Sequence, residues 1–173
     1  MSTDMNDKAE IQDRLWSELK KVRYGMLGVV GAQPAQHFQP MTAFAEKDEG
    51  AIWFFTRRDT DIAKAALGAS RVMFIVQAKD QEFQACIGGR LVQAFDRARV
   101  EKYWNPIVAA WYPQGKDDPG LTLLRMDATD AQVWVSQQNP VMFAYEITKA
   151  NLTHREPDVG ASATVDLNAR PGA

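Results

Sequence analysis

Short strand-like runs separated by turns occupy the middle of the sequence and limit the folds open to it. The runs cover residues 24–30, 37–45, 51–56, 71–78, 83–94, 121–126 and 131–135. They are rich in Val, Ile, Phe and Trp, which favour strands. Regular alternation of strands with helices is absent, which argues against a doubly wound parallel sheet. About six or seven short strands with a few helices predict a mainly β fold with flanking α-helices, built as an antiparallel barrel.

Three helices are expected around these strands. Apolar residues recur at helical spacing between residues 7 and 22, where a helix would cover one side of the barrel. Residues 59–67 favour a second helix, with Asp59 or Thr60 as its cap. A third helix begins near Asp96, which is a plausible capping residue.

A chain of 173 residues has the size of one compact domain. We expect a single domain with its N-terminal helix at about 7–22, its barrel at about 24–148 and a tail at 150–173. Gly88-Gly89 interrupts one strand-like run and indicates a bulge, a bend or close approach of another backbone.

Charge and hydropathy exclude two classes of partner. The formal net charge of -2 argues against a nucleic-acid-binding surface, which normally carries a basic excess. Apolar runs such as residues 51–55 and 72–76 are far shorter than the roughly 20 residues of a membrane span. The first ten residues are polar and mixed in charge, unlike a secretory signal.

Cysteine and histidine are too few for the usual metal sites. Cys86 is the only cysteine, so no internal disulfide forms and a reducing cytoplasm is expected. Its position within a strand suits a small buried hydrophobic residue. His37 and His154 are far apart in the sequence and belong to no metal-binding pattern. We therefore expect no metal site.

The segment 56–64 follows a strand and opens a helix, and it allows two interpretations. The hydroxyl and basic side chains that can gather there are Thr56, Arg57, Arg58, Thr60 and Lys64. Together with the free amides of a helix start they would suit one terminal phosphate. The alternative is a solvated basic turn with a helix cap. Residue chemistry alone favours this second interpretation.

Several motifs resemble those of the pyridoxamine 5'-phosphate oxidase-like FMN-binding split-barrel family, in its general stress protein branch. The order and spacing of these motifs carry the resemblance over residues 8–167. They are Gln39-Pro40-Met41-Thr42, Trp53-Phe54-Phe55-Thr56, Gly88-Gly89-Arg90-Leu91-Val92, Tyr103-Trp104-Asn105-Pro106, Asp117-Asp118-Pro119, Ala131-Gln132-Val133-Trp134 and Pro157-Asp158-Val159-Gly160. The resemblance implies a six-stranded antiparallel split β-barrel. It also implies a homodimer with FMN at the subunit interface, FAD or a deazaflavin being the alternatives.

The resemblance also implies contacts with the flavin ring and the ribityl chain. Gln39 stands where the family commonly has an arginine that reaches the ribityl-phosphate side. Met41 and Thr42 follow on the strand that runs along the ring in the family. Gln84 occupies the place of a glutamine that contacts the flavin in the oxidases. Glutamine can donate a hydrogen bond but cannot neutralise a phosphate, so Gln39 departs from the family pattern.

Phosphate contacts are implied at the end of the third run. Phe55-Thr56 matches the family's aromatic-threonine pair. Lys64, with Thr60, is similar to the phosphate clamp that follows this pair. The loop is longer than in the oxidases, so Arg57 or Arg58 is expected to replace part of the clamp.

Three functions are compatible with the resemblance. The first is a flavin-dependent oxidoreductase of unknown substrate, linked to the general stress response. The second is a non-catalytic flavin-binding or stress-sensing protein, and the third is a scaffold that has lost the flavin. The vitamin oxidase itself is excluded, because its substrate signature is not recognisable after Trp134. No catalytic residue is assigned.

Overall fold

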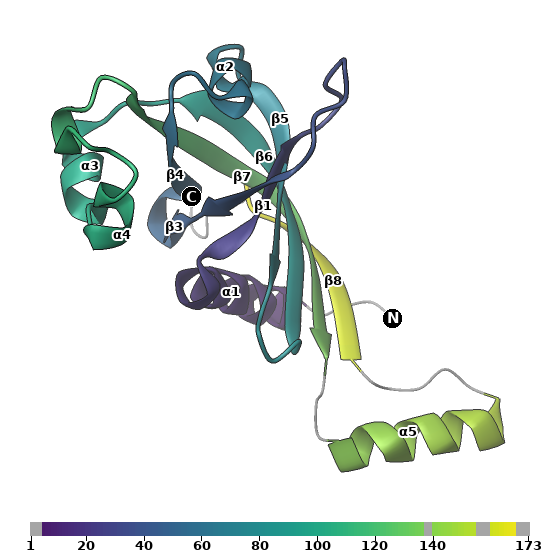
Figure 1. Cartoon of the computed structure of the whole chain (residues 1–173). Helices are drawn as coiled ribbons and strands as arrows, with labels where there is room; N and C mark the ends of the chain where they lie inside the picture. The colour runs from purple at the N-terminus through teal and green to yellow at the C-terminus, as the bar shows by residue number, and fades with distance from the viewer. Residues whose placement is uncertain (1–4, 137–139, 155–159, 169–173) are drawn as a thin grey trace.

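The computed structural model describes residues 5–136, 140–154 and 160–168 of the chain. Its helices are α1 (Met5–Val22), α2 (Asp61–Leu67), α3 (Arg97–Tyr103), α4 (Pro106–Ala109) and α5 (Pro140–Thr153), with short 3-10 turns at Lys47–Glu49 and Gly115–Asp117. Its strands are β1 (Tyr24–Val29), β2 (Gln39–Thr42), β3 (Phe44–Glu46), β4 (Ala51–Arg57), β5 (Ser70–Gln77), β6 (Phe83–Gln93), β7 (Leu121–Ser136) and β8 (Gly160–Asp166). Figure 1 shows them as a curled sheet with helices around it.

The sheet closes into a barrel because one bent segment, β2 and β3, forms both edges of the sheet. The strand order is β2-β1-β5-β6-β7-β4-β3, and every pairing is antiparallel. β2 and β3 are separated only by Ala43, so consecutive parts of one segment pair with β1 and with β4. Counting β2 and β3 as one bent strand gives six barrel strands, and β8 is added alongside β7. The predicted split-barrel class is confirmed.

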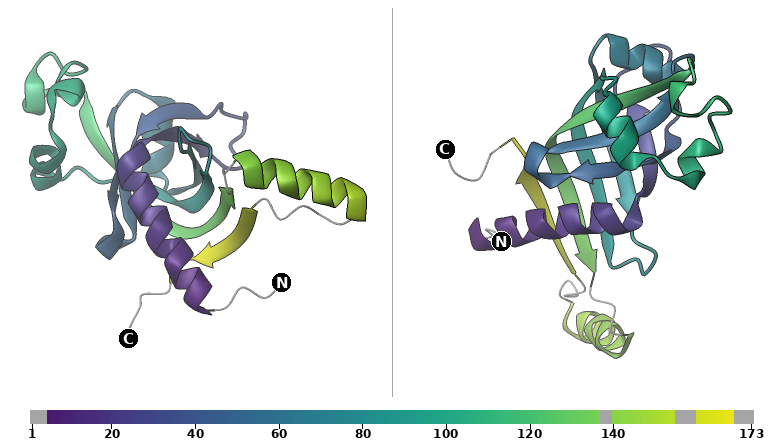
Figure 2. Two further views of the ribbon diagram at one scale, coloured as in Figure 1. Left: turned by 90° about the horizontal axis from the view of Figure 1, so that it is seen from below. Right: turned by 90° about the vertical axis from the view of Figure 1, so that its left-hand side faces the viewer.

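The main apolar core lies inside the barrel, and α1 covers one end of it. β5 shows the expected alternation, with Val72, Phe74 and Val76 buried and the residues between them exposed. Leu15 and Leu19 of α1 belong to the same buried cluster. Figure 2 shows α1 lying across the lower end of the barrel.

Local features of the sequence fix one β-bulge and two helix starts in this architecture. The β6–β7 register shifts between Gly88 and Gly89, so the glycine pair marks a β-bulge, one of the three features expected. Thr60 caps α2 by accepting a hydrogen bond from the Ala63 amide at 3.4 Å. Asp96 caps α3 in the same way.

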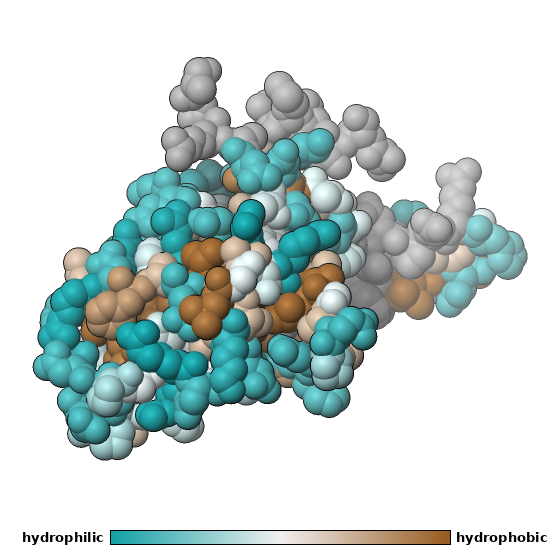
Figure 3. Space-filling model, turned by 90° about the horizontal axis from the view of Figure 1, so that it is seen from above, coloured by the Kyte–Doolittle hydropathy of each residue, from teal (hydrophilic) through white to brown (hydrophobic). Residues whose placement is uncertain are grey.

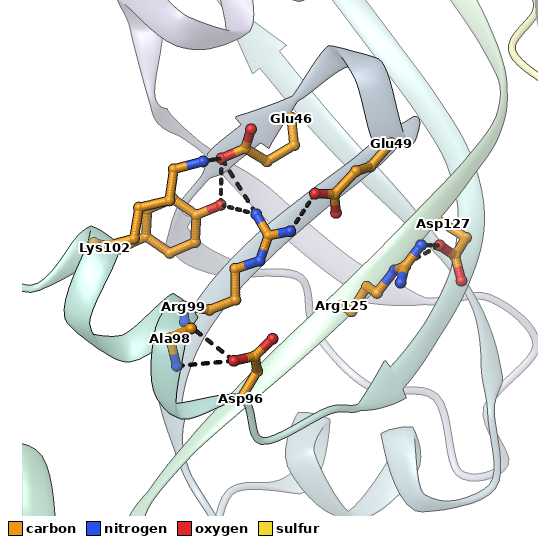
Figure 4. Close-up of polar contacts among 9 residues, drawn as sticks. Glu46, Glu49, Asp96, Ala98, Arg99, Lys102, Arg125 and Asp127 are labelled. Atoms are coloured by element: carbon orange, nitrogen blue, oxygen red, sulfur yellow. Dashed lines mark hydrogen bonds and ion pairs between the residues drawn. The ribbon is translucent and has the colours of Figure 1, made fainter.

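A second apolar cluster joins α3 and α4 to the outer side of β3 and β4. It contains Phe44, Trp53, Val100, Tyr103, Val108, Tyr112, Leu121 and Leu123. Polar contacts reinforce it: Glu46 on β3 accepts hydrogen bonds from Lys102 and Tyr103, and Arg99 donates one to Glu49 (Figure 4). The Arg99 guanidinium also lies 5.1 Å from the centre of the Trp53 ring. These contacts hold the α3–α4 excursion in a defined place.

The C-terminal third contains more regular structure than the sequence indicated. β7 is one continuous strand through residues 127–130, where two separate runs were expected. The region predicted as a tail from residue 150 contains the end of α5 and all of β8. Residues 155–159 and 169–173 of that tail lie outside the described part of the chain. α5 stands away from the barrel in both views of Figure 2.

The outer surface is largely hydrophilic with apolar patches. Seen from above, brown apolar residues interrupt a mostly teal surface (Figure 3). None of the described helices combines the length and apolar character that crossing a membrane requires.

Candidate functional site

A cleft of about 750 Å³ lies between the mouth of the barrel and α4. Its lining comes from the start of β1, from β2, from the ends of β3 and β4, and from the segment around α4. These residues are Arg23, Tyr24, Pro40, Met41, Thr42, Phe44, Phe55, Thr56, Arg57, Thr60, Asn105, Pro106, Ile107, Val108, Trp111 and Tyr112. Cofactor sites usually measure 300–1,000 Å³, so the cleft has a suitable size.

Two arginines and several hydroxyl groups give the cleft its polar part. The Thr56 and Thr60 hydroxyls lie 3.1 Å apart, and Thr60 also donates to the Arg57 carbonyl at 2.8 Å. Arg57 is half exposed, with its Nε 3.6 Å from Asp59. Its guanidinium rests over Gly120, where an added Cβ would lie 2.5 Å from Nη2. The absence of a side chain at Gly120 therefore leaves room for this guanidinium.

Arg23 occupies the junction between α1 and β1. Its φ of 60° is in the left-handed region, which a side chain other than glycine seldom adopts. Its carbonyl accepts a hydrogen bond from the Ala43 amide at 2.6 Å, and its amide donates to Leu19. These two bonds hold the unusual backbone conformation that places Arg23 in the cleft lining.

Aromatic and apolar side chains form the opposite wall. The Phe55 ring lies 6.4 Å from the Tyr112 ring and 6.2 Å from the Trp104 ring. Burial raises the pKa of Tyr112 to about 12, with Asp118 raising it further and Arg57 opposing the change. Tyr112 is thus a neutral phenol at physiological pH, able to donate a hydrogen bond.

Six of the nine residues predicted from the sequence meet at this cleft. They are Met41, Thr42, Phe55, Thr56, Arg57 and Thr60. The structure brings together two segments that lie about fifteen residues apart in the sequence, because β2 crosses the mouth of the barrel near the end of β4. Their contact with a flavin stays a prediction.

The other three predicted residues are not part of the lining. Lys64 is on the exposed side of α2, with its Nζ 3.9 Å from Asp61. Gln39 begins β2 opposite Leu27. Gln84 is on the outer face of β6, where its amide donates to the Gln81 carbonyl at 2.7 Å. Lys64 therefore does not line the cleft, and its part in a phosphate clamp stays a prediction.

The cleft also contains residues that the sequence analysis did not select. Arg23, Trp111 and Tyr112 are the most informative of these, because they contribute charge, a flat ring and a hydrogen-bond donor. The clustering of aromatic residues around Trp104 and Trp111 is the sequence signal that indicates Trp111 and Tyr112. Among the described residues, no three His, Cys, Asp or Glu side chains form a group that could hold a metal.

Comparison with known proteins places the sequence in a family. The family model described as pyridoxamine 5'-phosphate oxidase like matches residues 10–158. No curated protein matches.

Solved structures agree with this match. A general stress family protein from Xanthomonas campestris is 43% identical, covering 78% of this chain and 93% of its own, with a TM-score of 0.70. The general stress FMN/FAD binding protein from Xanthomonas citri is 42% identical, covering 76% and 92%, with a TM-score of 0.69. A structure described as general stress protein 26 from Jannaschia sp. CCS1 is 33% identical, covering 91% and 99%, with a TM-score of 0.76. This chain therefore belongs to the pyridoxamine 5'-phosphate oxidase-like family, in its general stress protein branch.

Proposed function

We propose that this protein binds a flavin nucleotide, most simply FMN, in the cleft at the mouth of the barrel. The phosphate would lie near Arg57 and Arg23, and the Thr56 hydroxyl, which lies 3.1 Å from that of Thr60, would turn to donate to it. The flat ring would lie along Met41 and Phe55. A bound flavin supplies hydride or electron transfer, while the protein holds and orients it.

The proposal rests on the division of the cleft into a positively charged part and an apolar part. Among the described residues that line the cleft, only Arg23 and Arg57 carry a full charge, so the polar part is positive and suits an anion. The rest is predominantly aromatic and apolar, which suits a planar ring. The flavin-binding name of the Xanthomonas citri protein supports the same assignment.

Flavin titration of Arg57 and Lys64 variants tests this placement. Arg57→Gln removes a cation from the cleft lining and should weaken FMN binding by about 1.5–3 kcal/mol, the range of a charge-assisted hydrogen bond. Lys64→Gln is the matched control, because Lys64 lies outside the lining. Riboflavin has no phosphate, so neither variant should change its affinity. Equal weakening of FMN by both variants, or by neither, would refute the placement.

We further propose that the bound flavin takes part in an oxidoreductase reaction linked to the stress response. Purified protein reconstituted with FMN should lose the flavin absorbance on addition of NADH or NADPH and regain it with an acceptor. The alternative is a binding protein without turnover. It is favoured by the cleft lining, which holds no His, Cys, Lys, Asp or Glu among the described residues. Binding without reduction by either nucleotide would select this alternative.

We also propose a homodimer, and the outer face of the sheet supports it. Exposed Met26 is opposite exposed Ile75, which is in turn opposite the partly buried Cys86. Gln84 is opposite Trp134 on the same face. We propose that this glutamine contacts the flavin of the other subunit. A self-complementary apolar face of this kind suits a two-fold dimer.

Light scattering of variants tests the dimer. Ile75→Glu should convert it to a monomer, because the new charge would be desolvated at the interface. Leu67→Glu on the exposed surface of α2 is the control and should leave the mass unchanged. A wild-type protein that stays monomeric at every concentration would refute the dimer.

A further inference from the structure

The α4 side of the cleft presents a large apolar surface that folding leaves uncovered. Ile107 and Trp111 both line the cleft, yet 65% and 74% of their surfaces are exposed. Single exposed apolar residues are ordinary, but two neighbours on the wall of one cleft are typical of a binding surface.

A helix cap and buried apolar contacts fix the position of this wall. Asn105 caps α4 by accepting hydrogen bonds from the Ile107 and Val108 amides at 2.9 and 3.1 Å. Val108 and Tyr112 are buried in the second apolar cluster with Phe44 and Leu121. Trp111 is therefore presented by a rigid support, which lowers the entropic cost of binding a ligand against it.

The polar groups of the wall favour a ligand that can accept hydrogen bonds. The Asn105 amide already donates to the Tyr103 carbonyl at 3.0 Å, and its oxygen is used in the cap. Among the described residues, no hydrogen-bond partner is assigned to the Tyr112 hydroxyl or the Trp111 indole N–H, and both groups are donors. A ligand on this wall would contribute an oxygen that accepts a hydrogen bond.

The charges of the cleft determine which ligands are disfavoured. No carboxylate is present in the described lining, and both charged residues there are arginines. A cation would meet the two arginines, while the Asp59 carboxylate beside Arg57 lies outside the lining. An anion would compete for the arginines that the proposed function assigns to the flavin phosphate. An uncharged ligand avoids both problems.

We propose that the α4 wall binds a flat, uncharged aromatic molecule carrying a hydroxyl or carbonyl oxygen, stacked on Trp111. Its role as the second substrate beside the flavin rests on the proposed function. The binding itself depends only on the wall. Trp111 is the residue that determines specificity, through the area and planarity of its ring.

Three naphthalene probes of one shape and different charge test the proposal. 2-Naphthol is uncharged, 2-naphthoate is an anion and 2-(aminomethyl)naphthalene is a cation at neutral pH. Calorimetry should show 2-naphthol binding to flavin-free and FMN-loaded protein. The cation should bind at least about tenfold more weakly, because no carboxylate balances its charge. FMN should weaken binding of the anion more than that of 2-naphthol.

Variants at Trp111 separate stacking from general structure. Trp111→Ala should reduce 2-naphthol affinity about tenfold, the scale of one lost aromatic contact. Trp111→Phe keeps a flat ring and should retain most of the affinity. The control is Phe95→Ala, which removes a half-exposed ring that lies outside the cleft, over Arg58. It should leave 2-naphthol binding unchanged.

Other outcomes would overturn the inference. Unchanged 2-naphthol affinity in Trp111→Ala shows that the wall does not bind the probe. Weakened FMN affinity in that variant, with 2-naphthol unaffected, shows that the wall belongs to the flavin. A changed dimer mass in that variant, again with 2-naphthol unaffected, shows that a second subunit covers it. If FMN fails to bind while 2-naphthol binds through Trp111, the proposed function fails and the wall remains a binding site.

Discussion

Replacing Glu46 with glutamine removes the negative charge that ties α3 to β3, and α3 leads directly into the wall of the cleft. Glu46 accepts hydrogen bonds from Lys102 and Tyr103, and its carboxylate lies 3.6 Å from Arg99 (Figure 4). Only 21% of the Glu46 side chain is exposed. The contacts are thus only partly screened by water.

The expected loss of unfolding free energy follows from these contacts. A hydrogen bond to a charged group contributes about 1.5–3 kcal/mol, whereas a contact with an exposed lysine contributes at most about 1 kcal/mol. Glutamine keeps one acceptor oxygen, so part of the Tyr103 bond survives. We expect Glu46→Gln to lower the unfolding free energy by about 2 kcal/mol at pH 7, measured by urea denaturation.

The pH dependence gives this prediction its sharpest test. Burial raises the pKa of Glu46, but hydrogen bonds from Lys102 and Tyr103 and the charges of Lys102 and Arg99 outweigh it, so the pKa lies below 4.5. A lowered carboxyl pKa stabilises the fold above the unfolded value, and this stability is lost as the pH falls through the folded value. The wild type and Glu46→Gln should therefore differ fully at pH 7 and converge in acid.

Glu101→Gln is the matched control. Glu101 is also paired, with Lys116 and Arg97, but it lies on the solvent side of α3, so its replacement should change stability little. The reasoning is refuted if Glu46→Gln and Glu101→Gln behave alike, or if the Glu46→Gln difference is the same at pH 7 and pH 3.

Three further changes test other parts of the structure. Gly89→Ala should lower the unfolding free energy by about 1–3 kcal/mol, because the new Cβ would lie 2.6 Å from the Asp127 carbonyl oxygen. Gly68→Ala is the control: its Cβ would meet no atom closer than 3.8 Å, so it should be neutral or stabilising in the same urea assay. Thr122→Val should raise the unfolding free energy by about 1 kcal/mol, because the buried Thr122 hydroxyl has no partner among the described residues, and a loss would contradict this. Burial raises the pKa of Tyr112 from 10.0 to about 12, so its contribution to stability is full below pH 10 and declines above it. The pKa of Tyr103 is raised as well, so Tyr112→Phe should make the alkaline decline smaller without abolishing it in denaturation series from pH 8 to 11. An unchanged decline would exclude Tyr112 as a source.

Much of the barrel could be predicted because its strands carry their pattern locally. β5 alternates buried and exposed residues, and Gly88-Gly89 marks the bulge of β6 in the sequence itself. β8 was missed because its residues, Gly160–Asp166, are mostly small or polar and lack a strong apolar alternation. It becomes a strand by pairing with the second half of β7, a contact that local propensity does not reveal.

The site was partly predictable for a related reason. Met41, Thr42, Phe55 and Thr56 belong to motifs that can be read directly. Lys64 was included in the predicted clamp because it is close to Thr56 and Thr60 in the sequence. Its position on α2 faces solvent and lies outside the cleft lining. Arg23 was missed because its place in the cleft depends on a left-handed backbone at the α1–β1 junction. An arginine in a sequence does not predict this backbone conformation.

β7 pairs with β6 along most of its length, with β4 through its first half and with β8 through its second. A nascent polypeptide that has left the ribosome only as far as Gly120 therefore holds β4 and β6 as open edges. Such edges invite pairing with other chains, and the late arrival of their common neighbour delays closure. Pairing of the strand that begins at Leu121 covers both edges, and we expect the nascent chain to aggregate less from that point on.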